Sequence, residues 1–104
     1  MISIKPGASL VGIQPEMLLA VMVAAGAYQD HGADDLVITE GSGGKHMVGS
    51  LHVSGRAVDI RTSNLPASSP PDVVAGVIRR ALGPDWDVVW EPEPAHIHIE
   101  WQPK

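Results

Sequence analysis

Residues 17–27 form an apolar run, MLLAVMVAAGA, which constrains the fold more than any other feature of the sequence. Pro15 stands where the first turn of a helix tolerates proline, and Gly32 is placed as a stop after the last turn. We therefore predict one helix over residues 14–31. Because this helix is apolar on nearly every side, we expect it to be central in the fold.

The same run has some features of a secretion signal, since small residues stand at its end. A run of eleven residues is too short to span a bilayer, and Glu16 precedes it where a signal would carry positive charge. We therefore expect no signal peptide and no membrane insertion. The protein is expected to be made in the cytoplasm.

Four short strands and a second helix are predicted in the rest of the chain. The strands are expected at residues 36–39, 57–61, 86–90 and 96–101, and the helix at residues 72–82. This order lacks the repeated strand-helix alternation of a parallel doubly wound fold. We predict an α+β fold in which the helices pack on one side of a small antiparallel sheet.

Length and charge limit the organisation and the partners. The 104 residues suit a single domain over residues 1–104, which we expect to be a monomer. The net charge is −5 and the seven Lys and Arg residues are scattered, which argues against a nucleic-acid partner or an anionic membrane. Because the chain has no cysteine, a metal site would have to use histidine and carboxylate.

Two short segments carry most of the chemically informative residues. The first is SLHVSGRAVD at residues 50–59, and the second is HIHIEW at residues 96–101. The period of two along a strand puts Asp59 on the polar face of its strand, and it puts His96 and His98 on the polar face of theirs. The two polar faces are expected to converge at one sheet edge.

His52, Asp59 and one histidine of the later pair can then meet around one metal ion. Two imidazoles and one carboxylate leave the fourth position of a tetrahedral zinc open for water, as in catalytic zinc sites. Residues two apart on one strand face stand roughly 6.5 to 7 Å apart, so only one of His96 and His98 is expected to be a ligand. Glu100 is either a partner of the ligand histidine or an ordinary residue of the sheet surface, and we favour the second interpretation.

The pattern Ser-x-His-x-x-Gly-x-Ala-x-Asp followed by His-x-His resembles a family of zinc peptidases. This family includes D-alanyl-D-alanine carboxypeptidases, phage endolysins that cut peptidoglycan stem peptides, and the hedgehog signalling domain. Residues 50–60 (SLHVSGRAVDI) and 95–98 (AHIH) are especially similar to hedgehog. The resemblance runs from about residue 36 to residue 101 and implies a hedgehog/D-Ala-D-Ala metallopeptidase-like fold.

The resemblance also implies roles for particular residues. The ligands of one zinc ion would be His52, Asp59 and His98. Two further histidines, His96 and His46, match positions that handle protons or the developing oxyanion. We expect Ser50 and Arg56 to contact the substrate.

The identity of the general base is left open by a departure from the family. Family peptidases often carry an acidic residue three positions before the last ligand, where this chain has Ala95, and hedgehog has a glutamate six positions before it, where this chain has Pro92. Glu91 and Glu93 flank this gap. We expect Glu93 or His96 to accept the proton.

A second departure concerns calcium. Hedgehog has an acidic calcium-binding loop where this chain reads GSGGK at residues 41–45. A loop without carboxylates cannot form a site for a hard cation, so we expect zinc but no calcium.

These features predict a zinc-dependent hydrolase that cleaves a peptide bond in peptidoglycan stem peptides. It would act as a carboxypeptidase or endopeptidase, for example as a phage endolysin that reaches the cell wall or periplasm after release. One alternative is a non-catalytic, hedgehog-like zinc-binding module, which the missing carboxylate at Ala95 supports. Another is a phage tail-associated component that assists wall penetration.

Overall fold

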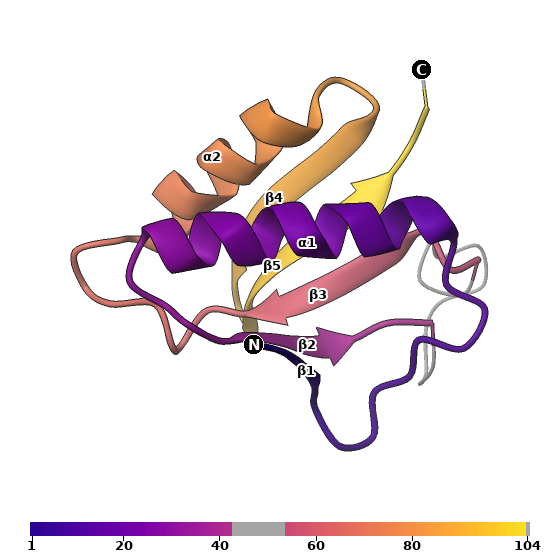
Figure 1. Ribbon diagram of the computed structural model, residues 1–104, viewed down its shortest axis with the longest axis horizontal. Helices are drawn as coiled ribbons and strands as arrows, with labels where there is room; N and C mark the ends of the chain where they lie inside the picture. The colour runs from indigo at the N-terminus through magenta and orange to yellow at the C-terminus, as the bar shows by residue number, and fades with distance from the viewer. Residues whose placement is uncertain (43–53, 104) are drawn as a thin grey trace.

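The structure, a computed structural model, describes residues 1–42 and 54–103. Its elements in chain order are β1 (Ile2–Ile4), α1 (Pro15–Asp30), β2 (Leu36–Glu40), β3 (Ala57–Arg61), α2 (Pro71–Leu82), β4 (Trp86–Pro92) and β5 (Ala95–Trp101) (Figure 1). Both helices and four of the strands were predicted from the sequence, with bounds that differ by at most two residues. The strand β1 was not predicted; it has only three residues, all exposed.

The five strands form one mixed sheet with the order β1-β2-β3-β5-β4. The pairs β2–β3, β3–β5 and β5–β4 are antiparallel, whereas β1 pairs with β2 in parallel. The expectation of a wholly antiparallel sheet was therefore wrong for β1. The physical reason is that α1 joins β1 to β2 as a crossover connection, which returns the chain to the same end of the sheet.

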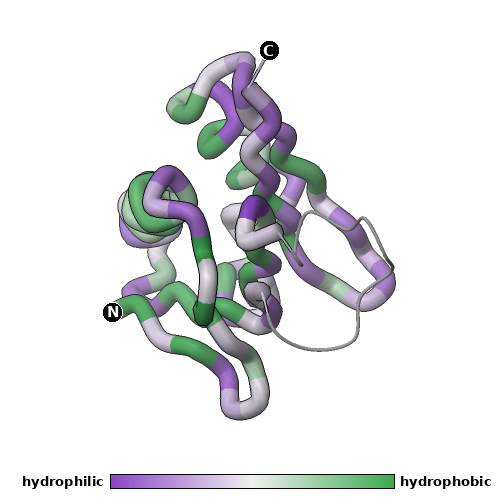
Figure 2. Tube along the Cα trace, turned by 90° about the vertical axis from the view of Figure 1, so that its right-hand side faces the viewer, coloured by the Kyte–Doolittle hydropathy of each residue, from purple (hydrophilic) through white to green (hydrophobic). Residues whose placement is uncertain are grey.

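Both helices cover the same side of the sheet, as predicted (Figure 1). Figure 2 looks along α1 and shows this helix standing to one side of the strands. Alternate residues of the central strands face the helices and are fully buried, among them Val58, Ile60, Ile97 and Ile99. The residues between them, including Asp59 and His98, are consequently on the open side of the sheet.

One expectation for α1 was wrong, because this helix is not surrounded by other parts of the described chain. Met17 and Tyr28 are fully buried, but Leu18, Leu19 and Met22 are 50%, 65% and 63% exposed. The described fold has only two layers, so the outward side of α1 is left uncovered. In residues 1–42 and 54–103, no helix combines the length and apolar character needed to cross a membrane.

Gly55 joins the start of β3 to the loop that precedes α1. Its φ of +74° lies in the region that favours glycine, and a Cβ added there would lie 2.2 Å from the carbonyl oxygen of Gly12. The Gly55 carbonyl also accepts a hydrogen bond from the backbone N–H of Gln14 at 2.9 Å. Gly55 therefore fixes how the segment carrying Asp59 enters the sheet.

Substituting this glycine should lower stability. We expect Gly55→Ala to reduce the free energy of unfolding by about 2 to 4 kcal/mol, because the new methyl group meets backbone that has little freedom to move. Gly26→Ala is the control, since Gly26 lies in α1 with nothing within 4 Å of its added Cβ, and it should raise stability by up to about 1 kcal/mol. Urea denaturation measures both. Equal stability of Gly55→Ala and wild type would contradict this close approach.

Candidate functional site

The register of β3 and β5 places Asp59 directly opposite His98. Asp59 Oδ1 lies 2.7 Å from His98 Nδ1, although the two residues are 39 positions apart in the sequence. The side chains are only 9% and 16% exposed, so solvent screens their interaction weakly. The structure thus brings together two of the three residues predicted to bind zinc.

Glu100 is a direct partner of His98, and our expectation of an ordinary surface residue was wrong. Glu100 Oε1 lies 2.7 Å from His98 Nε2, and the side chain of Gln102 donates a hydrogen bond to the other carboxylate oxygen. The spacing of two residues on one strand was the sequence signal for this contact. A carboxylate at Nε2 fixes the ring so that Nδ1 faces Asp59, as outer-shell carboxylates do for metal-binding histidines.

The two carboxylates change the protonation of His98. Burial alone would lower the pKa of this imidazole, but the hydrogen bonds and charges of Asp59 and Glu100 outweigh burial and raise the pKa to about 9. Without a metal, His98 is therefore an imidazolium between two carboxylates at neutral pH. A metal ion bound at Nδ1 would replace the proton on that nitrogen.

A pH dependence of stability follows for the metal-free protein. The pKa of His98 is about 9 in the folded chain, against 6.5 for an unperturbed histidine, so the stabilisation is complete below pH 6.5 and is lost as pH rises towards 9. We expect a loss on the order of 1 to 2 kcal/mol, because solvent weakens a partly exposed pair.

Urea denaturation after chelator treatment, at pH 6 and at pH 9, measures this loss. His98→Gln is the control and should flatten the pH dependence, since glutamine does not titrate. If the free energy of unfolding changes with pH in the same way in the wild type and in His98→Gln, His98 is not the source of the pH dependence.

His96 lies beside this pair on the same face of β5. Its Nε2 is 3.8 Å from Asp59 Oδ1 and 3.5 Å from Glu91 Oε1, and its Nδ1 contacts the carbonyl oxygen of Pro94. Because a carbonyl can only accept, Nδ1 must carry a proton. Nε2 is therefore the nitrogen of neutral His96 that can take up a further proton.

Glu91 and Glu93, the two glutamates considered for the missing acidic base, lie in different parts of the structure. Glu91 is on β4, and the register of β4 and β5 puts it directly opposite His96. Glu93 is exposed in the turn that joins these strands. Glu91, rather than Glu93, is therefore the glutamate of this pair that lies beside His96. The strand predicted over residues 86–90 stops one residue before Glu91, so this pairing was not predicted.

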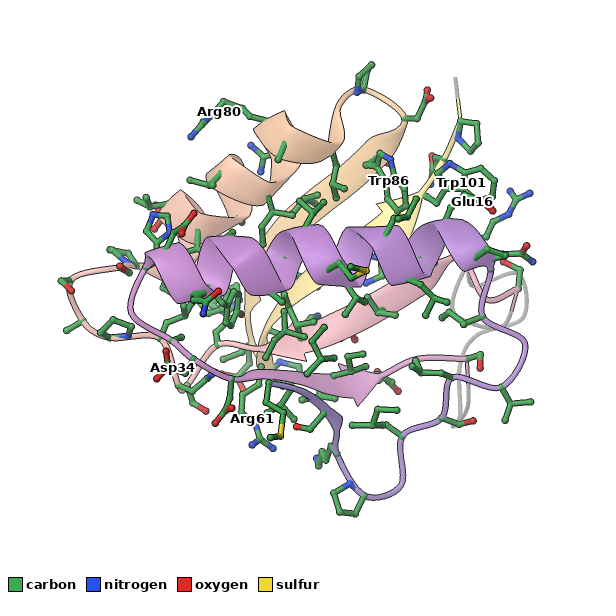
Figure 3. The ribbon with its side chains drawn as sticks, in the orientation of Figure 1. Glu16, Asp34, Arg61, Arg80, Trp86 and Trp101 are labelled. Atoms are coloured by element: carbon green, nitrogen blue, oxygen red, sulfur yellow. The ribbon has the colours of Figure 1, made fainter. Side chains whose placement is uncertain are left out.

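Arg56 is not brought together with the Asp59 and His98 pair. Its guanidinium lies 5.4 Å from the centroid of the Trp101 ring, and this ring contacts Trp86 at a centroid distance of 6.3 Å. Figure 3 labels both tryptophans. By the alternation along β3 and β5, Arg56 and Trp101 belong to the helix-covered side of the sheet. Arg56 therefore does not share the face of the sheet that carries Asp59 and His98, and its contact with a substrate stays a prediction.

Three other predicted site residues, His46, Ser50 and His52, lie outside the described residues, as do residues 43–45 of the loop expected to lack calcium. Within the described ranges, no group of three or more histidines and carboxylates is arranged to hold a metal ion. Of the three predicted zinc ligands, Asp59 and His98 are therefore the two that the structure describes.

A pocket of about 350 Å³ opens beside Asp59 and His96. Its described lining residues are Lys5, Thr39, Glu40, Asp59, Pro94, Ala95 and His96. A shift in the β2–β3 register between Ile38 and Glu40 puts Glu40 opposite Asp59. Lys5, Thr39 and Glu40 were not predicted as site residues, because the sequence does not show how β1 and β2 join the sheet.

Comparison of the chain with known protein families, curated proteins and solved structures found no match.

Proposed function

We propose that this protein is a zinc hydrolase that cuts a peptide bond in peptidoglycan stem peptides. One observation carries the proposal: Asp59 and His98 contact each other across β3 and β5 at 2.7 Å, beside His96 and a pocket. A carboxylate and an imidazole joined in this way are two ligands of the kind zinc takes. The motif adds His52 as the third ligand.

The donor set fits zinc. Asp59 Oδ1 and His98 Nδ1 face each other, both side chains are largely shielded from solvent, and Glu100 holds the far nitrogen of His98. Three protein ligands leave one position open, and there the ion would polarise the scissile carbonyl and lower the pKa of a water molecule.

His96 supplies the proton chemistry of the proposed reaction. Its Nδ1 proton is held by the Pro94 carbonyl, so Nε2 is free to take a proton from the attacking water. Glu91, 3.5 Å from this nitrogen, stabilises the imidazolium that results. His46, from the motif, is the further candidate to stabilise the tetrahedral oxyanion, and Glu93 is the alternative base.

One observation favours a second function, that of a zinc-binding module without turnover. Ala95 lines the pocket beside His96, at the position where peptidases of the resembled family often carry an acidic base. A site with the metal ligands but without an effective base would bind zinc and its ligand without cutting it.

Mass spectrometry of purified peptidoglycan after incubation with the zinc-loaded protein distinguishes the two functions. We expect new stem-peptide ends, which disappear when a chelator removes the metal and return when zinc is restored. Unchanged peptidoglycan, with zinc bound at stoichiometric occupancy, would instead establish the non-catalytic module.

A further inference from the structure

Lys5 is the only lysine or arginine among the described residues that line the pocket. It follows β1 directly, and its backbone is held on both sides. Its N–H donates to the carbonyl of Ile38 at 2.9 Å, and its carbonyl accepts from the N–H of Ala8 at 3.0 Å. The position of Lys5 relative to β2 is therefore set by the fold, although its side chain is free to reach into solvent.

The pocket runs across the sheet from Lys5 to His96. Lys5 follows β1, Glu40 is on β2, Asp59 is on β3 and His96 is on β5, which is also the order of these strands in the sheet. Two strand spacings separate β1 from β3, or roughly 10 Å. An extended lysine side chain spans roughly 6 Å of this distance, and the residue that follows the cut bond spans about 3.5 Å. A peptide cut at Asp59 and His96 would thus bring a group within a few residues of the cut bond to Lys5.

The charges along the pocket restrict where a negative group can bind. Glu40 and Asp59 are the carboxylates among its described lining residues, and both lie between Lys5 and His96 in strand order. A substrate carboxylate beside Glu40 would meet a like charge, whereas at Lys5 it would meet an opposite one. Apart from the proposed zinc ion, Lys5 therefore offers the favourable place for an anion in this pocket.

We propose that Lys5 binds a carboxylate of the substrate, within a few residues of the cut bond. This inference rests on the proposed function, since it takes the bond to be cut at Asp59 and His96. The carboxylate has two sources in peptidoglycan stem peptides. It is either the chain-terminal carboxylate of a peptide ending in D-Ala-D-Ala or the free carboxylate of D-Glu after L-Ala.

Two pairs of synthetic peptides test the proposal and separate the sources. One pair ends in D-Ala-D-Ala, as the free acid and as the C-terminal amide. The other contains L-Ala-D-Glu, with the D-Glu carboxylate free and as the amide. Binding to the zinc-loaded protein is measured by calorimetry at low salt, and cleavage is measured separately. The pair in which the wild type prefers the acid identifies the source.

We expect Lys5→Met to weaken binding of that acid about three- to tenfold and to leave binding of its amide unchanged, as befits one partly exposed ion pair. Lys5→Arg should retain most of the preference. Arg80→Met is the matched control, because it removes the same charge from an exposed position on α2 and should change neither peptide (Figure 3).

The outcomes separate the two proposals. Equal effects of Lys5→Met on acid and amide, or no preference of the wild type for either acid, would overturn the role of Lys5 even if the peptides are cut. A Lys5-dependent preference for an acid that is bound but never cut would support the role of Lys5 and refute the hydrolase.

Discussion

His98→Ala is expected to abolish zinc binding. His98 Nδ1 lies 2.7 Å from Asp59 Oδ1, and without this imidazole the proposed site keeps only one described ligand. The loss of zinc affinity should exceed the roughly 10- to 100-fold loss that follows removal of an outer-shell partner, which is what we expect for Glu100→Ala. Elemental analysis after zinc-replete purification and competition with a chromogenic chelator measure the two effects.

His31→Ala is the matched control for the loss of a histidine. Its ring nitrogen contacts the carbonyl of Ala27 at the end of α1, a helix on the side of the sheet opposite to Asp59 and His98, and the variant should bind zinc like the wild type. Asp59→Ala should lose zinc as His98→Ala does. If Asp59→Ala or His98→Ala keeps its full zinc content, the substituted residue is not a zinc ligand.

His96→Ala is expected to keep zinc and to lower turnover of a stem peptide by about two to four orders of magnitude, the usual contribution of a general acid or base. The physical reason is that His98 and His96, both on β5, have different neighbours. His98 is within hydrogen-bonding distance of Asp59, whereas His96 Nε2 is 3.8 Å away and has Glu91 beside it. Zinc content and steady-state turnover, measured on the same preparation, test both parts.

The glutamates provide the comparison for this prediction. If His96 accepts the proton, Glu91→Gln should lower turnover more than Glu93→Gln, because Glu91 is the carboxylate next to the His96 ring. The reverse order, with His96→Ala still active, would identify Glu93 as the base. Release of zinc by His96→Ala would mean that the roles of His96 and His98 are exchanged.

The central part of the site could be predicted because strand alternation is a local property. Val58 and Ile60 identify the core face of one strand, and Ile97 and Ile99 identify that of another. The polar residues between them had to share the opposite face once the two strands paired. The contact of Asp59 with His98 follows from this pattern and from the register.

The remaining features depend on contacts that the sequence does not encode locally. A three-residue strand such as β1 has too few residues to show a period, so its parallel pairing and the place of Lys5 were not predicted. The composition of α1 indicates apolar side chains but not whether another layer covers them, and Met22 is in fact exposed. The pairing of Glu91 with His96 required the true end of β4.

The most direct test of the proposed zinc site is a crystal structure of the zinc-replete protein with diffraction data collected on both sides of the zinc absorption edge. We predict one anomalous peak bonded to a carboxylate oxygen of Asp59, to Nδ1 of His98 and to His52. The absence of a zinc peak, or a peak that touches neither Asp59 nor His98, would contradict the proposed site.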